Sequence, residues 1–141
     1  MKTVVKLNKW ANLHTYVVID TLRIMTGLFL VLKGIQFATQ TRYLEDILGS
    51  AGTSLGASFI LIHYVTMSHL CGGVLVAFGL LTRLSLLVQL PILIGAVAVN
   101  FMGTMNIDNM LQASVIALLA IFFIIYGSGK HSVDYSLKMN V

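Results

Sequence analysis

Apolar residues dominate the chain in four long segments, which cover residues 16–38, 57–81, 84–102 and 110–126. Each is close to the roughly 17–25 residues that an α-helix needs to cross a bilayer. A helix is the expected conformation, because an open strand would leave backbone groups without hydrogen bonds in lipid. Only Thr82 and Arg83 separate the second and third segments, so these two must run antiparallel. The pattern predicts an all-α, membrane-embedded antiparallel four-helix bundle, with a single domain over residues 1–141.

The longest connection, residues 39–56, has mixed polarity at its start. Residues 42–48 predict a short helix at the membrane interface, with Gly49 ending it. The remainder is rich in glycine, serine and threonine, and is expected to be a loop.

Glycines follow the fourth segment and predict where it stops. Gly127 or Gly129 can end the helix in a left-handed conformation. Ser132 or Asp134 can then cap a following turn. We therefore interpret residues 127–141 as a helix stop followed by a basic tail.

The composition agrees with lipid as the surroundings of these segments. Hydrophobic residues make up 57% of the chain and charged residues only 10%, whereas a soluble domain carries about 25% charged residues. Basic residues precede the first segment, follow the fourth and include Arg83, all on one predicted side, while Arg42 alone lies on the other. This positive-inside distribution predicts a multi-pass membrane protein with both termini in the cytoplasm. The net charge of +4 thus reports topology, and nucleic acid is not an expected partner.

Three ionisable residues lie inside the first apolar segment: Asp20, Arg23 and Lys33. A charge at the bilayer centre costs roughly 2.5–3.5 kcal/mol on insertion scales, so such residues mark a polar feature between helices. At about 100° per residue, Asp20, Arg23 and Gly27 share one helix face, and the first two can pair. Either this is a structural ion pair, or Arg23 anchors an anionic or carbonyl-bearing ligand. Lys33 lies nearer the outer end, where it either reaches the head groups or lines a site.

Two histidines lie in the second segment. His63 and His69 are six residues apart, which is not the i, i+4 spacing by which one helix chelates a metal, and no metal site is predicted. Each can make a polar contact with a neighbouring helix, and His69, which lies deeper, is the candidate for proton transfer. Gly73 follows closely; it allows either close helix packing or a ligand slot against bare backbone.

Three stretches resemble the DoxX family of small bacterial membrane proteins: residues 22–34, residues 69–83 and residues 127–134. They contain Leu-Arg-Ile-Met-Thr-Gly, Cys-Gly-Gly-Val-Leu with a Thr-Arg turn, and Gly-Ser-Gly-Lys-His-Ser-Val-Asp. The resemblance implies a compact four-helix bundle in the bacterial inner membrane. It also implies a subunit serving thiosulfate:quinone-type oxidation, or an accessory partner in redox-stress or sulfur-related complexes. One departure matters, because the family usually has Glu where this chain has His69.

These observations lead to three functional hypotheses. The first is an accessory subunit of a quinone- or sulfur-linked membrane complex, rather than a self-sufficient enzyme. In it, Arg23 would polarise a quinone carbonyl or hold a sulfur oxyanion, and His69 would exchange protons. A quinone is the candidate cofactor, and nothing predicts a covalently bound one. The second hypothesis is a non-catalytic assembly subunit, and the third a small-molecule permease. The expected partners are the lipid bilayer and other membrane subunits, or further copies of the chain.

Overall fold

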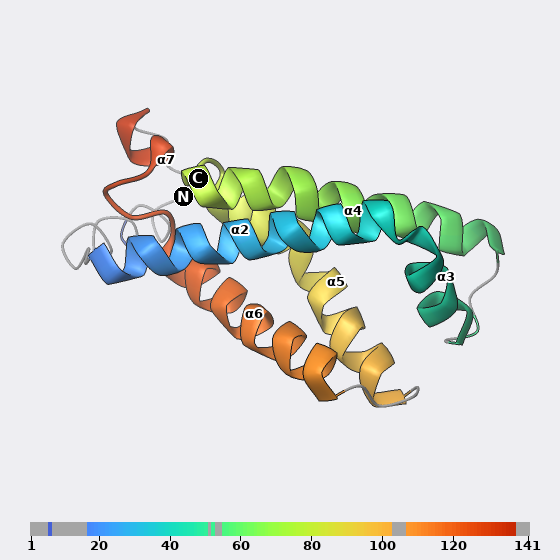
Figure 1. The fold of residues 1–141 in the computed structure, drawn as a ribbon. Coiled ribbons are helices and arrows are strands. Elements are labelled where there is room, and N and C mark those ends of the chain that lie inside the picture. The colour runs from blue at the N-terminus through green and yellow to red at the C-terminus, as the bar shows by residue number, and fades with distance from the viewer. Residues whose placement is uncertain (1–5, 7–16, 51, 53–54, 103–106, 138–141) are drawn as a thin grey trace.

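The computed structural model describes residues 6, 17–50, 52, 55–102 and 107–137, and every regular element in these ranges is helical (Figure 1). The four long helices are α2 (Val17–Thr39), α4 (Leu55–Phe78), α5 (Thr82–Met102) and α6 (Ile107–Tyr126). The two short ones are α3 (Thr41–Ser50) and α7 (Val133–Ser136). Helix α3 contains the short helix predicted at residues 42–48 and continues past Gly49.

Helices α2 and α4 pack with their backbones in direct contact, and glycines make this possible. A Cβ atom on Gly27 would lie 2.4 Å from the backbone nitrogen of Ala77, and one on Gly73 would lie 2.8 Å from the carbonyl oxygen of Gly27. Gly34 continues the contact, because a Cβ there would lie 2.9 Å from the backbone nitrogen of Leu70. Small residues are the usual means by which membrane helices approach closely, since lipid gives them no hydrophobic driving force to associate.

Helices α5 and α6 form a second pair that meets the first at only one end. In Figure 1 the pairs converge beside the α4–α5 turn and α7, and α5 and α6 diverge from α2 and α4 toward the end that carries α3. The buried core follows the converging part; its members are Leu30, Val76, Leu86, Leu93, Ile116, Ala120, Phe123 and Tyr126. The diverging part leaves space between the four helices.

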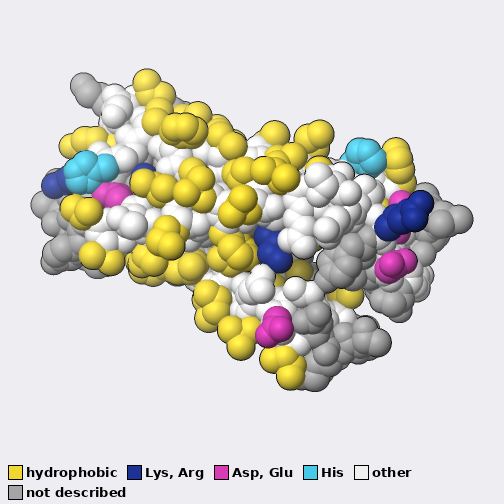
Figure 2. Space-filling view, in the orientation of Figure 1, with side chains coloured by type: hydrophobic (Ala, Val, Ile, Leu, Met, Phe, Trp, Pro, Cys, Tyr) yellow, Lys and Arg dark blue, Asp and Glu magenta, His cyan; other side chains and the backbone are white. Residues whose placement is uncertain are grey.

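Among the described residues, three helices are long and apolar enough to cross a membrane: Ser58–Phe78 in α4, Thr82–Phe101 in α5 and Ile107–Tyr126 in α6. Helix α2 has a similar length of 23 residues but carries Asp20, Arg23 and Lys33. Large apolar side chains cover the outer surface of these helices, and charged side chains gather mainly toward the two ends (Figure 2). An apolar surface of this extent is expected to face lipid. The prediction of an all-α helical bundle in a membrane is confirmed.

The boundaries of the second and third helices differ from those predicted. Helix α4 ends at Phe78, not at residue 81, because Gly79 and Leu81 have left-handed φ angles of 70° and 48°. Helix α5 already begins at Thr82, and the two connecting residues inferred from the pattern are its first turn. Tyr16, where the first helix was predicted to begin, lies outside the described residues, as do residues 138–141 of the tail.

Candidate functional site

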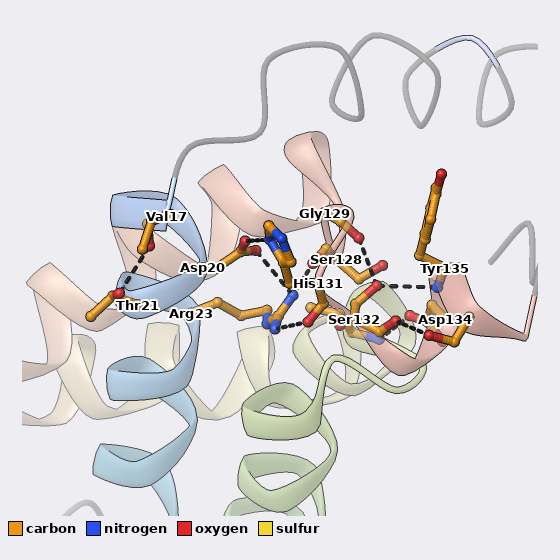
Figure 3. Close-up of polar contacts among 12 residues, drawn as sticks. Val17, Asp20, Thr21, Arg23, Ser128, Gly129, His131, Ser132, Asp134 and Tyr135 are labelled. Atoms are coloured by element: carbon orange, nitrogen blue, oxygen red, sulfur yellow. Dashed lines mark hydrogen bonds and ion pairs between the residues drawn. The ribbon is translucent and has the colours of Figure 1, made fainter.

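The guanidinium of Arg23 is buried at the converging end of the bundle, where it binds the segment that follows α6 (Figure 3). One terminal nitrogen donates to the carbonyl oxygen of Ser128, and the other donates to that of His131 at 3.2 Å. Arg23 is only 1% exposed, so these carbonyls and Asp20 replace water as its partners. We call this arrangement of Asp20, Arg23 and residues 127–136 the C-terminal junction.

Asp20 joins the junction through two partners. Its carboxylate lies 3.6 Å from Arg23, as the i, i+3 spacing predicted, and 2.6 Å from Nδ1 of His131. The two ends of the second contact differ in their surroundings, because the His131 side chain is 69% exposed and that of Asp20 only 10%. The shorter of the two contacts therefore ties the first long helix to a residue 111 positions away.

Asp134 completes the junction from the other side, at the start of α5. Its carboxylate accepts from the backbone N–H groups of Leu81 at 2.9 Å and Thr82 at 3.4 Å, and its own N–H donates to the carbonyl of Gly79. A carboxylate at this position satisfies N–H groups that the first turn of a helix leaves free, and it complements the helix dipole. Gly79 has no space for a side chain, because a Cβ there would lie 2.6 Å from Cβ of Ser132.

The remaining residues of this segment close the helix ends. Gly127, directly after α6, has a φ of 92°, and Gly129 has a φ of 76°. The Ser132 hydroxyl accepts from the N–H of Tyr135 at 3.1 Å and so caps α7. Arg83 donates to the carbonyls of the last two residues of α6, at 3.2 Å and 3.5 Å, where a cation also suits the helix dipole.

A cavity of about 350 Å³ lies between the helix pairs where they diverge. All four long helices contribute to it, and most of its wall is apolar or aromatic. Its lining residues with polar side chains are Lys33, Gln36, Tyr64, His69, Asn100, Asn109 and Gln112. A cavity of this size with a few polar groups is typical of small-molecule sites.

Lys33 and His69 are the ionisable groups with most to offer a ligand in this cavity. The Lys33 ammonium lies 5.7 Å from the ring centroid of Phe29, within the range of a cation–π contact. The described residues give Lys33 no carboxylate partner, and no acidic residue lines the cavity. Within the part of the chain that the structure describes, the cavity therefore holds a cation with no counter-ion.

The hydrogen bond of His69 decides which ring nitrogen carries its proton. Nδ1 lies 3.0 Å from the carbonyl oxygen of Val65, which can only accept, so Nδ1 must hold a proton. In the neutral ring Nε2 is then the acceptor. His69 is only 4% exposed, and its ring packs against that of Phe37 in a T-shaped arrangement with 5.6 Å between centroids, which restricts its orientation.

Tyr64 links α4 to α5 near Pro91, and both residues line the cavity. Its hydroxyl donates to the carbonyl of Val88 on α5 at 2.8 Å. Pro91 lacks an N–H and interrupts the hydrogen bonds of this turn. The contact from α4 therefore lies within one turn of Pro91, next to Leu87, whose carbonyl has no helical donor at residue 91.

The DoxX family model matches residues 18–104, which is more than half of the chain. This chain belongs to the DoxX family. Neither the search of curated proteins nor that of solved structures found a match. The matched range covers α2 to α5, and the C-terminal junction packs α7 and the segment before it onto this range.

In this DoxX-family chain the residues predicted from sequence separate into two places. Asp20 and Arg23 lie in the C-terminal junction and do not line the cavity, whereas Lys33 and His69 do. The cavity lining therefore includes His69 and not Arg23, whereas the first hypothesis placed both residues at one ligand. Gly27 and Gly73 lie at the contact of α2 with α4, where each meets backbone.

His63 lies away from the cavity, on the outer surface of α4. Its Nδ1 bonds to the carbonyl of Phe59 at 2.9 Å, and the two rings lie 4.3 Å apart. The described residues contain no group of three histidine, cysteine or acidic side chains that could hold a metal ion.

Sequence reasoning missed two residues of this DoxX-family chain. His131 was not predicted as the partner of Asp20, because no sequence pattern links positions so far apart. Gln89 is fully buried on α5, and neither of its amide atoms has a hydrogen-bond partner among the described residues. An amide in the middle of an apolar segment was a visible signal for it.

Proposed function

We propose that this DoxX-family chain is a membrane subunit that binds a quinone head group in the cavity, as the accessory partner of a quinone- or sulfur-linked redox complex. The observation that carries the proposal is that Lys33 and His69 line one largely apolar cavity, and that the ammonium of Lys33 has no acidic partner among the described residues. A bound quinone supplies two-electron, two-proton chemistry, and the partner protein would supply or remove the electrons.

The lining residues fit such a ligand by shape and by charge. Aromatic side chains of Phe29, Phe37 and Tyr64 form flat apolar walls, which suit a ring. Lys33 can donate to a carbonyl oxygen and stabilise negative charge that develops on it, which a low-dielectric surrounding strengthens. Nε2 of His69 can accept a proton from a hydroxyl or return it, while Nδ1 stays bound to Val65.

The cellular setting is part of the proposal. We propose that the end with the C-terminal junction faces the cytoplasm of a bacterium, in the inner membrane. This is supported by Arg83, Lys130 and the start of α2 lying together at that end, in agreement with the positive-inside distribution.

The binding step is tested with a short-chain ubiquinone analogue and the full chain in lipid nanodiscs. We expect Lys33→Met and His69→Leu each to raise the Kd about tenfold or more, measured by calorimetry. Lys130→Met and His63→Leu remove the same chemical groups from exposed positions outside the cavity and serve as matched controls. A Lys33→Met, His69→Leu double variant that binds as tightly as the wild type would refute the proposal.

The accessory role is tested separately in native membranes. We expect a tagged chain, purified in mild detergent, to bring a quinone- or sulfur-linked oxidoreductase with it. Recovery of the chain alone, with the analogue still bound, would refute the accessory role and leave the cavity assignment standing.

A further inference from the structure

Three polar residues form a stripe along the buried face of α5. Thr82, Ser85 and Gln89 lie within about 60° of one another around the helix, since successive residues turn by about 100°. All are buried, with exposures of 1%, 6% and 0%. We call them the α5 stripe. Both hydroxyl oxygens and both amide atoms of Gln89 lack hydrogen-bond partners among the described residues.

The buried hydroxyl of Ser85, like those of Thr66 and Thr82, has no hydrogen-bond partner among the described residues. Other hydroxyls in the long helices do bond to their own helix. Thr26 and Ser114 each donate to the carbonyl four residues earlier, at 2.7 Å. The carbonyl four residues earlier can accept a hydrogen bond from a buried hydroxyl, which then needs no partner on another helix. Ser85 has the equivalent carbonyl, that of Leu81, within reach of its turn, but only its backbone N–H bonds there. Its hydroxyl is therefore directed elsewhere.

Gln89 lies against α4 at a position where that helix has no side chain. A Cβ atom on Gly72 would lie 2.3 Å from Nε2 of Gln89, so any larger residue would displace the amide. Gly72 is one turn from His69 on the same helix. The amide is thus held between α4 and α5, close to the helix turn that carries the cavity histidine.

The stripe joins the two ends of this region. It starts at Thr82, in the α4–α5 turn that Asp134 caps, and the same face of α5 continues through Ile92, Leu93 and Ala96, which line the cavity. Buried hydroxyls and amides rarely remain without partners, and ordered water is the usual partner where protein supplies none. Each group in the stripe can both donate and accept, as a hydrogen-bonded file of water requires.

We propose that the α5 stripe holds a file of water molecules between α4 and α5 that carries protons from the α4–α5 turn to His69. A proton that arrives along the file is taken up by Nε2, because Nδ1 keeps its own proton on the carbonyl of Val65. The imidazolium then passes a proton to an oxygen atom of the cavity ligand, or returns it to the file. The proposal rests on the proposed function only in its last step, the transfer of the proton to the cavity ligand.

Water contact is tested first on the wild-type chain in hydrated lipid vesicles. Water-edited solid-state NMR measures magnetisation transfer from water to the side-chain amide of Gln89, whose signal is assigned by its loss in Gln89→Met. The exposed Gln40 provides the matched amide. We expect transfer to Gln89 within about threefold of that to Gln40. No transfer to Gln89 at mixing times that saturate Gln40 would overturn the proposal.

The proton route is tested on His69 itself. We expect a Ser85→Ala, Gln89→Met double variant to slow proton exchange at Nε2 of His69, measured by the ¹⁵N line broadening of that nitrogen, at least tenfold. Gln40→Leu should leave this exchange unchanged. Methionine is close to glutamine in shape, so the double variant should fold. If it does not, the water-to-Gln89 transfer in the wild type still tests whether the file of water exists. Exchange that is unchanged in the double variant, or slowed only by filling the cavity with Ala96→Phe, would overturn the route.

The two proposals fail in different measurements. The stripe does not line the cavity, so the double variant should bind the ubiquinone analogue as the wild type does. Loss of analogue binding in Lys33→Met, with water transfer to Gln89 intact, supports both. If the Lys33 and His69 variants bind the analogue as the wild type does, the quinone proposal is refuted and the water file is unaffected. If Gln89 receives no magnetisation from water, the water file is refuted and the quinone proposal is unaffected.

Discussion

Replacing Arg23 by methionine should destabilise the C-terminal junction without leaving a large cavity in it. Methionine keeps most of the buried volume and removes both donors, so the carbonyls of Ser128 and His131 lose their partner, as does one side of Asp20. Removing one member of a buried charged pair typically destabilises a protein by about 3–5 kcal/mol. We expect a loss of that order in the free energy of unfolding, because Arg23 is only 1% exposed.

The Arg23→Lys variant should have a free energy of unfolding between those of Arg23→Met and the wild type. It keeps the charge but cannot span two carbonyls as the planar guanidinium does. The loss of one hydrogen bond to a charged group is worth roughly 1.5–3 kcal/mol, which sets the expected effect of Arg23→Lys. Arg42→Met serves as the control, because Arg42 is exposed on α3 and surface changes of this kind stay within about 0.5 kcal/mol.

The measurement has a global part and a local part. Reversible unfolding in mixed micelles gives the free energies, and hydrogen exchange reports on residues 127–136. We expect the exchange of this segment to rise in Arg23→Met before that of α4 does, because Arg23 makes two of the hydrogen bonds that link the segment to α2. Wild-type stability together with wild-type protection of residues 127–136 in Arg23→Met would refute the reasoning.

Three further predictions concern packing, capping and orientation. Gly27→Ala should separate α2 from α4 and lower the unfolding free energy in micelles, whereas Gly95→Ala, which has open space around it, should not; equal effects would contradict the packing assignment. Asp134→Ala should cost about 1–2 kcal/mol, since it removes the acceptor for the first amides of α5. The exposed Asp46→Ala is its control, and equal stability of the two variants would argue against the cap. Cys71 is exposed on a spanning helix and should react with a membrane-impermeant maleimide only after SDS unfolding; labelling in intact vesicles would place it in water.

Much of the fold could be predicted from hydropathy and spacing. Long apolar segments report their own surroundings, because in lipid every backbone group must bond within its own helix. The helix ends were less predictable. The residues that end α4 early, Gly79 and Leu81, adopt left-handed conformations that depend on contacts with Ser132 and Asp134, from the far end of the chain.

The site was only partly predictable. Periodicity correctly placed Asp20 within reach of Arg23, since one helix turn joins them. It could not show that the carbonyls of Ser128 and His131 occupy the guanidinium, because backbone carbonyls are present in every sequence. It also could not place Lys33 inside a cavity, because that position depends on how α5 and α6 diverge from α2 and α4.

By itself, the sequence determined that lipid surrounds this protein, and it determined the number and approximate length of the long helices. It also showed that the first of them contains ionisable residues. These are local properties, set by the cost of exposing charge and backbone to hydrocarbon. Only the tertiary structure decided which charges are used within the fold and which face a ligand space. Arg23 and Lys33 lie in the same helix, and their difference arises because helices distant in sequence close around one and open around the other.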